Sequence, residues 1–150
     1  AWEAGPRTYL GVATHGFPNM FMITGPGSPS VLANVIACIE QHVEWITDCM
    51  DALRSRGVIE IEARLDDQDK WVDHVNAVAS QTLFMHAKSW YLGDNIEGKP
   101  RVFMPYPGGL NVYRETCAAV AKAGYTGFSL AKSPAATHSS RDSAPKGQLP

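Results

Sequence analysis

The sequence predicts an α/β fold, because short apolar segments suited to strands alternate with longer amphipathic patterns suited to helices. An apolar triplet at 21–23 lies directly before a turn rich in glycine and proline. Apolar residues then recur at steps of three and four from 31 to 56. Two further apolar segments, at 102–104 and 128–130, flank another helical pattern over 112–123. We therefore expect helices and strands in alternation along the chain.

The first predicted strand, 21–23, leads into a turn that contains Gly25 and Gly27. Both glycines free the backbone for unusual dihedral angles and for the close approach of a ligand. The helix that follows would direct its unpaired N–H groups, and the positive end of its dipole, beyond the end of the strand. This arrangement favours an electron-rich cofactor edge, although an ordinary strand–turn–helix crossover produces the same pattern.

The helix predicted over 31–56 has one apolar face, and Gly57 suits the left-handed position that ends a helix. The next segment, 58–63, alternates weakly and is either a short strand or a solvent-covering extension. A second helix is predicted from 69 onwards, preceded by acidic residues that favour its amino end. The apolar residues of its face are Val72, Val75, Ala79 and Leu83. The helix over 112–123 is closed by Gly124.

Two segments carry turn-forming and polar residues instead of a periodic pattern. Residues 85–101 are rich in Gly, Asn, Asp and Pro, and the loop they predict is too long for a simple connection, which favours function. Residues 132–150 have almost no large apolar side chain. We therefore expect a folded portion over 1–131 and a disordered tail over 132–150.

The composition fits a globular chain, with 45% hydrophobic and 19% charged residues. The net charge of −2 provides no electrostatic footprint for nucleic acid or for an anionic membrane. No apolar run approaches membrane-spanning length and no signal pattern opens the chain, so we expect a cytoplasmic protein. Cys38, Cys49 and Cys117 are widely spaced, which favours free buried thiols over a disulfide framework or a metal site.

The residue types that often carry catalysis form no recognisable constellation. The five histidines show no H-x-x-x-H spacing, so we expect no metal site. His42 and His74 are expected at solvated helix positions. Ser28 and Ser30 lie near a turn, but neither is in a G-x-S-x-G elbow, so a hydrolase nucleophile is not expected. Trp90 lies in a polar loop, where it is either a ligand contact or an anchor packed on a neighbouring helix.

Three blocks of sequence carry a resemblance. The first is Gly16-Phe17-Pro18-Asn19 followed by Gly25-Pro26, and the second is Ser89-Trp90-Tyr91-Leu92-Gly93-Asp94-Asn95-Ile96-Glu97-Gly98-Lys99-Pro100-Arg101. The third has Gly108-Gly109 before Tyr113-Arg114 and then Ala123-Gly124-Tyr125-Thr126-Gly127-Phe128. In this order, over residues 5–130, they resemble the carboxyl-terminal part of the Baeyer-Villiger monooxygenases, flavoproteins that include cyclohexanone monooxygenase. Asp94 and Glu97 depart from the family pattern, in which alanine and proline are commoner.

Enzymes of this family bind FAD and NADPH through two glycine-rich fingerprints, and no G-x-G-x-x-G lies between a strand and a helix here. The resemblance therefore implies the carboxyl-terminal part of a flavoprotein with two Rossmann-like dinucleotide-binding domains, incomplete as it stands. It also implies that no catalytic residue lies within this chain. A non-enzymatic, stand-alone α/β binding or interaction module is the alternative, and the sequence upstream of residue 1 would distinguish the two.

For the full-length protein, the resemblance implies a monomeric, FAD- and NADPH-dependent monooxygenase. It would insert one atom of O2 into ketones, giving esters or lactones through a C4a-peroxyflavin. Residues 87–101 match a mobile loop that folds over the cofactor. The cofactor contacts implied by the resemblance are Gly25, Pro26, Asn34, Val35, Trp90 and Lys99. The implied substrate contacts, which would form an apolar wall, are Ser30, Val31 and Leu32.

Overall fold

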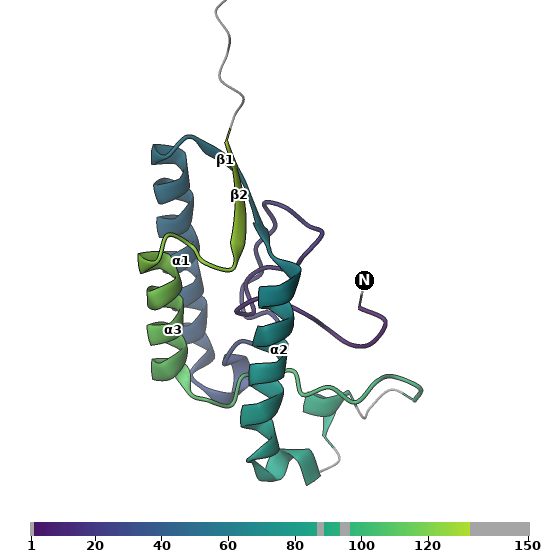
Figure 1. The fold of residues 1–150 in the computed structure, drawn as a ribbon. Coiled ribbons are helices and arrows are strands. Elements are labelled where there is room, and N and C mark those ends of the chain that lie inside the picture. The colour runs from purple at the N-terminus through teal and green to yellow at the C-terminus, as the bar shows by residue number, and fades with distance from the viewer. Residues whose placement is uncertain (1, 87–88, 94–96, 133–150) are drawn as a thin grey trace, which may run out of the picture.

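A computed structural model describes residues 2–86, 89–93 and 97–132. Its elements combine helices with a small antiparallel sheet, and this mixed content fits part of an α/β domain (Figure 1). The helices and strands, in chain order, are α1 (Val35–Ser55), β1 (Val58–Ala63), α2 (Leu65–Ser80), α3 (Leu110–Lys122) and β2 (Phe128–Lys132). Three short 3-10 turns complete the described elements: η1 (Ser30–Leu32), η2 (Leu83–His86) and η3 (Trp90–Leu92).

Helix α1 begins later than its apolar pattern predicts, because the residues before it form the separate turn η1. Asn34 caps the helix: its backbone is extended and its side-chain oxygen accepts a hydrogen bond from the Ala37 amide at 3.2 Å. The predicted end is confirmed, since Gly57 follows the helix with φ of +67°. Although α1 has 21 residues, neither it nor another described helix is long and apolar enough to cross a membrane.

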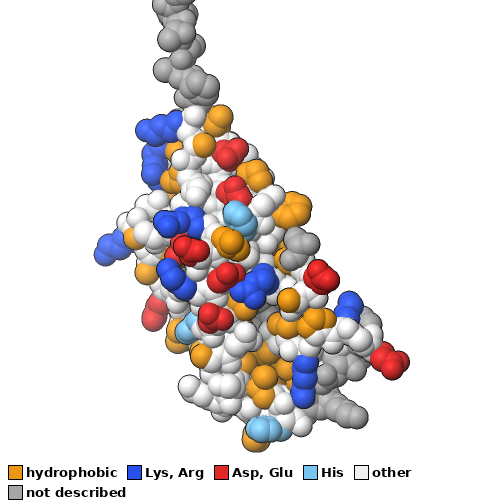
Figure 2. Space-filling model, turned by 45° about the vertical axis from the view of Figure 1, so that its right-hand side comes forward, with side chains coloured by type: hydrophobic (Ala, Val, Ile, Leu, Met, Phe, Trp, Pro, Cys, Tyr) orange, Lys and Arg blue, Asp and Glu red, His pale blue; other side chains and the backbone are white. Residues whose placement is uncertain are grey.

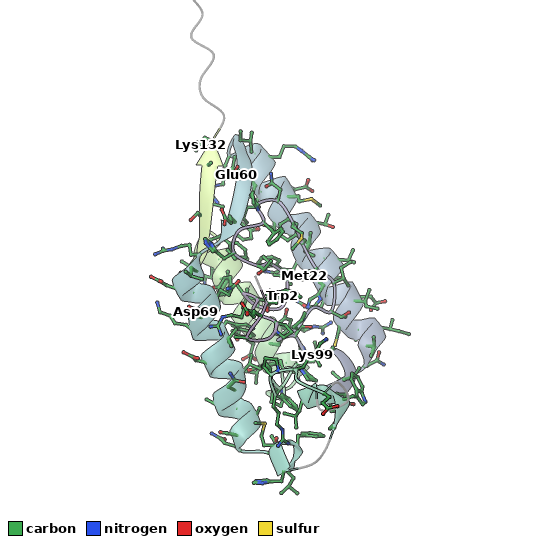
Figure 3. All side chains as sticks on the ribbon, turned by 90° about the vertical axis from the view of Figure 1, so that its right-hand side faces the viewer. Trp2, Met22, Glu60, Asp69, Lys99 and Lys132 are labelled. Carbon is green, nitrogen blue, oxygen red and sulfur yellow. The ribbon has the colours of Figure 1, made fainter. Side chains whose placement is uncertain are left out.

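The strand predicted at 128–130 is confirmed, and 58–63, for which the sequence allowed either a strand or a solvent-covering extension, is a strand that pairs with it. β1 and β2 are antiparallel, with Ile61 opposite Leu130 and Ala63 opposite Phe128. Lys132 belongs to β2, whereas the sequence places it in the tail; the remainder of the predicted tail lies outside the described residues. In Figure 3, Glu60 and Lys132 lie together at the end of this ribbon.

The strands predicted at 21–23 and 102–104 are wrong, because both segments are irregular in the structure. Each makes isolated hydrogen bonds to loops in place of a ladder. The Met22 amide donates to the Val12 carbonyl at 2.8 Å, and the Met104 amide donates to the Tyr91 carbonyl at 2.9 Å. Apolar character alone does not make a strand when no neighbouring strand supplies the regular partners.

Helix α2 begins at Leu65, before the predicted start at 69, and α3 begins at Leu110, before the predicted 112. The predicted apolar face of α2 holds at Val75 and Ala79, which are buried. It fails at Leu83, which lies in η2 and is 86% exposed. Trp71 is also buried on this face and stacks on Tyr106, with ring centroids 5.3 Å apart.

The core lies between the helices. In Figure 1, α1 and α3 run side by side, and in Figure 3 the irregular N-terminal segment lies between α1 and α2. The Trp45 indole N–H donates to the Cys117 carbonyl at 2.9 Å and so joins α1 to α3. The prediction of free, buried thiols is confirmed for all three cysteines. A second, smaller apolar cluster contains Ala79, Leu92 and Phe103.

Candidate cofactor and substrate site

A hollow of about 270 Å³ lies beside the amino end of α1. It brings together most of the residues for which the sequence indicates cofactor or substrate contact. Its lining residues are Thr24, Gly25, Pro26, Ser30, Val31, Val35, Trp90, Met104 and Pro105. The turn at 24–26, η1 and η3 therefore meet here although they are far apart in the chain. Most of these residues have apolar side chains, which is the character of a site for a small organic ligand.

A second hollow, of about 440 Å³, adjoins the first. Lys99 lies in its wall, so this predicted contact is separate from the first group, but Trp90 and Met104 line both hollows. Trp2 also lines it, and the sequence did not indicate this residue. Figure 3 shows Trp2 near the middle of the molecule, with Lys99 nearer the end that carries η2 and η3.

Trp90 stands between the two hollows. Its side chain is 56% exposed, and its ring contacts that of the adjacent Tyr91, with centroids 4.2 Å apart. Trp90 is therefore accessible to a ligand from the hollows that it lines. Figure 2 shows hydrophobic side chains gathered on the lower part of one face, the end of the molecule where η2 and η3 lie in Figure 1. Leu83 and Phe84 are also exposed in η2.

Besides Lys99, two more of the predicted contacts, Asn34 and Leu32, lie outside the first hollow. The Asn34 side chain is used in capping α1. Leu32 packs against the second apolar cluster, the one that contains Leu92 and Phe103. Adjacent residues of η1 thus have different surroundings: Val31 lines the hollow and is 42% exposed, while Leu32 is partly buried behind it.

The electrostatics of the first hollow come from the amino end of α1. The Asn34 side chain accepts the hydrogen bond of the Ala37 amide. The Asn34 carbonyl accepts the first intrahelical hydrogen bond, from the Cys38 amide at 3.0 Å. The amides of Val35 and Ile36 precede that bond, so the helix itself offers them no partner. Together with the helix dipole, these amides favour negative charge on a ligand beside Val35.

The glycine-rich turn is held from several sides. Gly25 lies so close to the Gly11 carbonyl that a Cβ at this position would collide with it. The Ser28 hydroxyl donates to the Gly25 carbonyl at 2.7 Å, and the Gly27 amide donates to the Met104 carbonyl at 2.6 Å. The Thr8 hydroxyl donates to the Pro26 carbonyl at 2.5 Å. The turn therefore reaches the hollow as a pre-formed backbone.

The prediction that His42 lies at a solvated helix position is wrong, because His42 is fully buried in α1. Burial lowers its pKa from 6.5 to about 4, so the ring is neutral. Its Nε2 lies 2.7 Å from the Tyr113 hydroxyl, and burial raises the pKa of Tyr113 well above 10. The spacing of His42 from Trp45, Ile46 and Cys49 is that of one buried helix face, and this signal could have revealed it.

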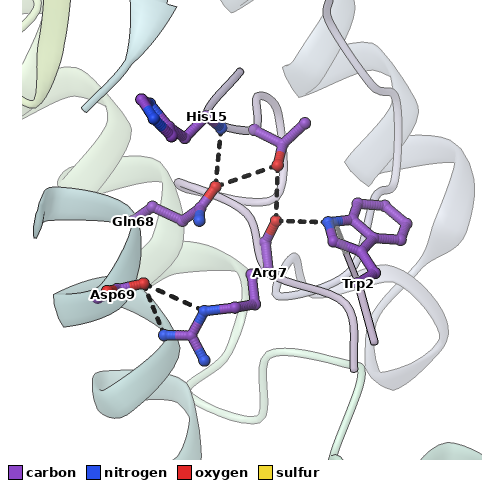
Figure 4. Close-up of polar contacts among 6 residues, drawn as sticks. Trp2, Arg7, His15, Gln68 and Asp69 are labelled. Atoms are coloured by element: carbon purple, nitrogen blue, oxygen red, sulfur yellow. Dashed lines mark hydrogen bonds and ion pairs between the residues drawn. The ribbon is translucent and has the colours of Figure 1, made fainter. Parts of the chain in front are cut away.

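A cluster of polar contacts attaches the N-terminal segment to α2 (Figure 4). The Arg7 guanidinium binds the Asp69 carboxylate through Nη2 at 2.6 Å and Nε at 3.1 Å. The Trp2 indole N–H donates to the Arg7 carbonyl at 3.1 Å, and the His15 amide donates to the buried Gln68 side chain at 2.8 Å. These contacts hold Trp2 at the second hollow. Among the described residues, no group of three or more His, Cys, Asp or Glu could hold a metal ion.

The chain is similar in sequence to known proteins. No protein-family model matches the chain. The chain is 42% identical over 125 residues to a Baeyer-Villiger monooxygenase of Pseudooceanicola batsensis, a match that covers 83% of this chain and 23% of the relative. It is 38% identical over 130 residues to the acetone monooxygenase (methyl acetate-forming) of Gordonia sp., covering 86% of this chain and 24% of that protein.

Solved structures agree with the sequence relatives. Cyclohexanone monooxygenase from Rhodococcus sp. Phi1 bound to NADP+ superposes with a TM-score of 0.84 at 36% identity, covering 88% of this chain and 24% of that one. OTEMO in complex with FAD and NADP superposes with a TM-score of 0.79 at 32% identity, covering 87% of this chain and 24% of that one. The chain, which spans about a quarter of the length of the curated relatives it matches, thus belongs to the Baeyer-Villiger monooxygenase family of flavoproteins.

Proposed function

We propose that this chain is part of an FAD- and NADPH-dependent monooxygenase that inserts one atom of O2 into ketones, giving esters or lactones. In that protein, residues 1–131 would be part of the FAD-binding and monooxygenase domain. The observation that carries the proposal is the hollow at the amino end of α1. It joins predicted cofactor residues, such as Gly25 and Trp90, to predicted substrate residues, such as Val31.

The residues of this hollow fit a flavin ring. When bound, FAD reduced by NADPH supplies the electrons that activate O2. The chain's part would be to hold the ring edge, between the turn at Gly25 and Pro26 and the start of α1 at Val35, which both line the hollow. Fixed amides stabilise negative charge on a reduced ring without reorganisation, because their dipoles are already oriented.

The substrate wall would come from η1. Val31 and Ser30 line the hollow, and Leu32 supports them by packing against the cluster behind. An apolar wall of this kind selects ketones by shape and excludes water from the reacting atoms. The groups that carry out the reaction would come from the remainder of the polypeptide and from the cofactors.

NADPH would be held at the second hollow. Trp90 offers a free aromatic face between the two hollows, and Lys99 places a positive charge in the wall of the second. A cation there suits the phosphates of a dinucleotide. Closure of the segment around Trp90 would retain the cofactor and exclude water.

For the whole enzyme, we further propose a monomer in the cytoplasm. The three buried cysteines, all free, support a reducing compartment. Light scattering of the purified holoenzyme would determine its oligomeric state.

A chimera tests the proposed activity. Residues 5–130 would replace the matching segment of the Gordonia acetone monooxygenase, which forms methyl acetate. We expect the chimera to retain FAD, to oxidise NADPH and to convert a ketone into an ester. The parent enzyme carried through the same purification is the control. A chimera that melts cooperatively, like its parent, but binds no FAD or forms no oxygenated product would refute the proposal.

A further inference from the structure

A buried chain of hydrogen bonds runs behind the candidate cofactor site, and the proposed function does not use it. The Thr24 amide donates to His42 Nδ1 at 2.8 Å. On the other side of the ring, His42 Nε2 and the Tyr113 hydroxyl are 2.7 Å apart. That hydroxyl donates to the Leu10 carbonyl at 2.6 Å. We call these four groups, the Thr24 amide, His42, Tyr113 and the Leu10 carbonyl, the relay. It joins two loops through one side chain from α1 and one from α3, and both side chains are fully buried.

The chemistry of the two end groups determines every proton in this relay. The Leu10 carbonyl can only accept, so the single Tyr113 hydroxyl proton is directed to it. His42 Nε2 must then carry a proton and donate to the hydroxyl oxygen. The Thr24 amide can only donate, so His42 Nδ1 must be unprotonated. Only the neutral Nε2–H form of His42 satisfies all of the groups at once.

The backbone of each loop is strained at the residue that the relay binds. Leu10 has φ of +55° and Thr24 has φ of +52°, in the left-handed region that residues with a Cβ seldom adopt. Such conformations cost free energy and persist only where the surroundings impose them. One end of the relay binds the Leu10 carbonyl and the other binds the Thr24 amide, so each strained residue has its own buried partner.

The two loops also contact each other directly. A Cβ at Gly11 would collide with Ser28, and a Cβ at Gly25 would collide with the Gly11 carbonyl. The turn that carries Gly25 can therefore take its position only if the loop at Leu10 keeps its own. Thr24 and Gly25 both line the first hollow, so the relay ends in the wall of the candidate cofactor site.

From this geometry, we propose that His42, oriented by Tyr113, is a positioning residue that sets the Thr24–Pro26 turn at the distance from the flavin that binding requires. This inference rests on the proposed function, because it assumes that the turn contacts FAD. Neither side chain touches the hollow itself. Their effect would pass through the Thr24 amide and the backbone of Gly25.

Three variants separate the links of the relay. His42→Phe removes both ring nitrogens, and Tyr113→Phe removes only the hydroxyl that orients the ring. His42→Asn is the rescue variant, because its side-chain oxygen reaches the position of Nδ1 and can accept from the Thr24 amide. Trp45→Phe is the matched control: it removes a buried hydrogen bond between α1 and α3, to the Cys117 carbonyl, and leaves the turn untouched.

Amide hydrogen exchange in the 150-residue chain provides a readout that does not depend on cofactor. We expect exchange at Thr24 to accelerate at least about tenfold in His42→Phe and in Tyr113→Phe, relative to a Trp45→Phe chain of similar stability. His42→Asn should restore protection at Thr24. Equal acceleration in the Trp45→Phe control would overturn the positioning role, because the effect would then be general loosening.

The chimera described above provides the second readout. There, His42→Phe and Tyr113→Phe should weaken FAD binding by about tenfold or more, and His42→Asn should recover most of that loss. Trp45→Phe should bind FAD as the unmodified chimera does. Unchanged FAD affinity together with fast Thr24 exchange would overturn the link to the cofactor. A chimera without these changes that holds no FAD would refute the proposed function instead, and Thr24 exchange would still decide whether His42 holds the turn.

Discussion

Trp90 and Val31 line the same hollow, although they come from two separate 3-10 turns that the chain places far apart. Trp90 also lines the adjoining hollow that contains Lys99, and Leu32, the residue after Val31, packs against the smaller apolar cluster. In the proposed enzyme, one wall would therefore meet both the nicotinamide cofactor and the ketone. Substitutions at the two residues should therefore have different kinetic consequences.

Trp90→Ala in the full-length context should leave FAD content intact and weaken NADP(H) binding by about five- to hundredfold. Loss of a stacking face or an indole hydrogen bond is worth about 1 to 3 kcal/mol. Water would also enter more easily, so hydrogen peroxide released per NADPH should rise. Trp90→Phe should fall between, because it keeps a ring and loses the N–H. The measurements are the NADP+ dissociation constant and oxygenated product per NADPH oxidised. Unchanged values, with only a lower melting temperature, would make Trp90 a loop anchor.

Val31→Ala should change which ketones are accepted while leaving the rate of flavin reduction by NADPH nearly unchanged, since the two half-reactions use different contacts. Leu32→Ala is the matched control, because Leu32 packs against the second cluster and not into the hollow. It should lower stability by about 1 to 3 kcal/mol without a selective effect on ketones. Product ratios for a ketone mixture, stopped-flow reduction and urea unfolding check this. If reduction slowed as much as turnover in Val31→Ala, the residue would position the cofactor instead.

His42 should make the fold sensitive to acid. Burial lowers its pKa from 6.5 to about 4, so the unfolded chain takes up the proton at a higher pH than the folded chain does. Stability from the neutral ring is complete above pH 6.5 and is lost as the pH falls toward 4, by about 3 kcal/mol. His42→Asn should lack this dependence on pH. Urea unfolding of both chains at pH 7 and pH 4 should show their stabilities converging by that amount. Parallel losses would contradict the prediction.

The 150-residue chain alone should bind FAD and NADPH no more tightly than about millimolar, because it has no glycine-rich cradle for a pyrophosphate. Flavin fluorescence during titration measures the first constant, and quenching of indole emission follows the second. Micromolar binding by this chain would show that the pyrophosphate contacts lie within it, contrary to the absence of a dinucleotide fingerprint.

The sequence by itself determined that the three helices exist and where α1 ends. α1, α2 and α3 follow from apolar residues at helical spacing, and Gly57 follows from the need for a left-handed residue after α1. These signals are local, since each depends on residues within a few turns of one another. The same local patterns, read together with three motif blocks, were sufficient to indicate the family.

Only the tertiary structure decided which segments became strands and which predicted contacts meet. The weakly patterned 58–63 is a strand because β2 pairs with it, whereas the more apolar 21–23 remains irregular among loop partners. Leu32 turned away from the hollow that Val31 lines, and His42 was buried because Tyr113 of a distant helix covers it. The physical reason is the same in each case: strand pairing and burial depend on what packs against a residue from elsewhere in the chain, and spacing along the sequence does not contain that information.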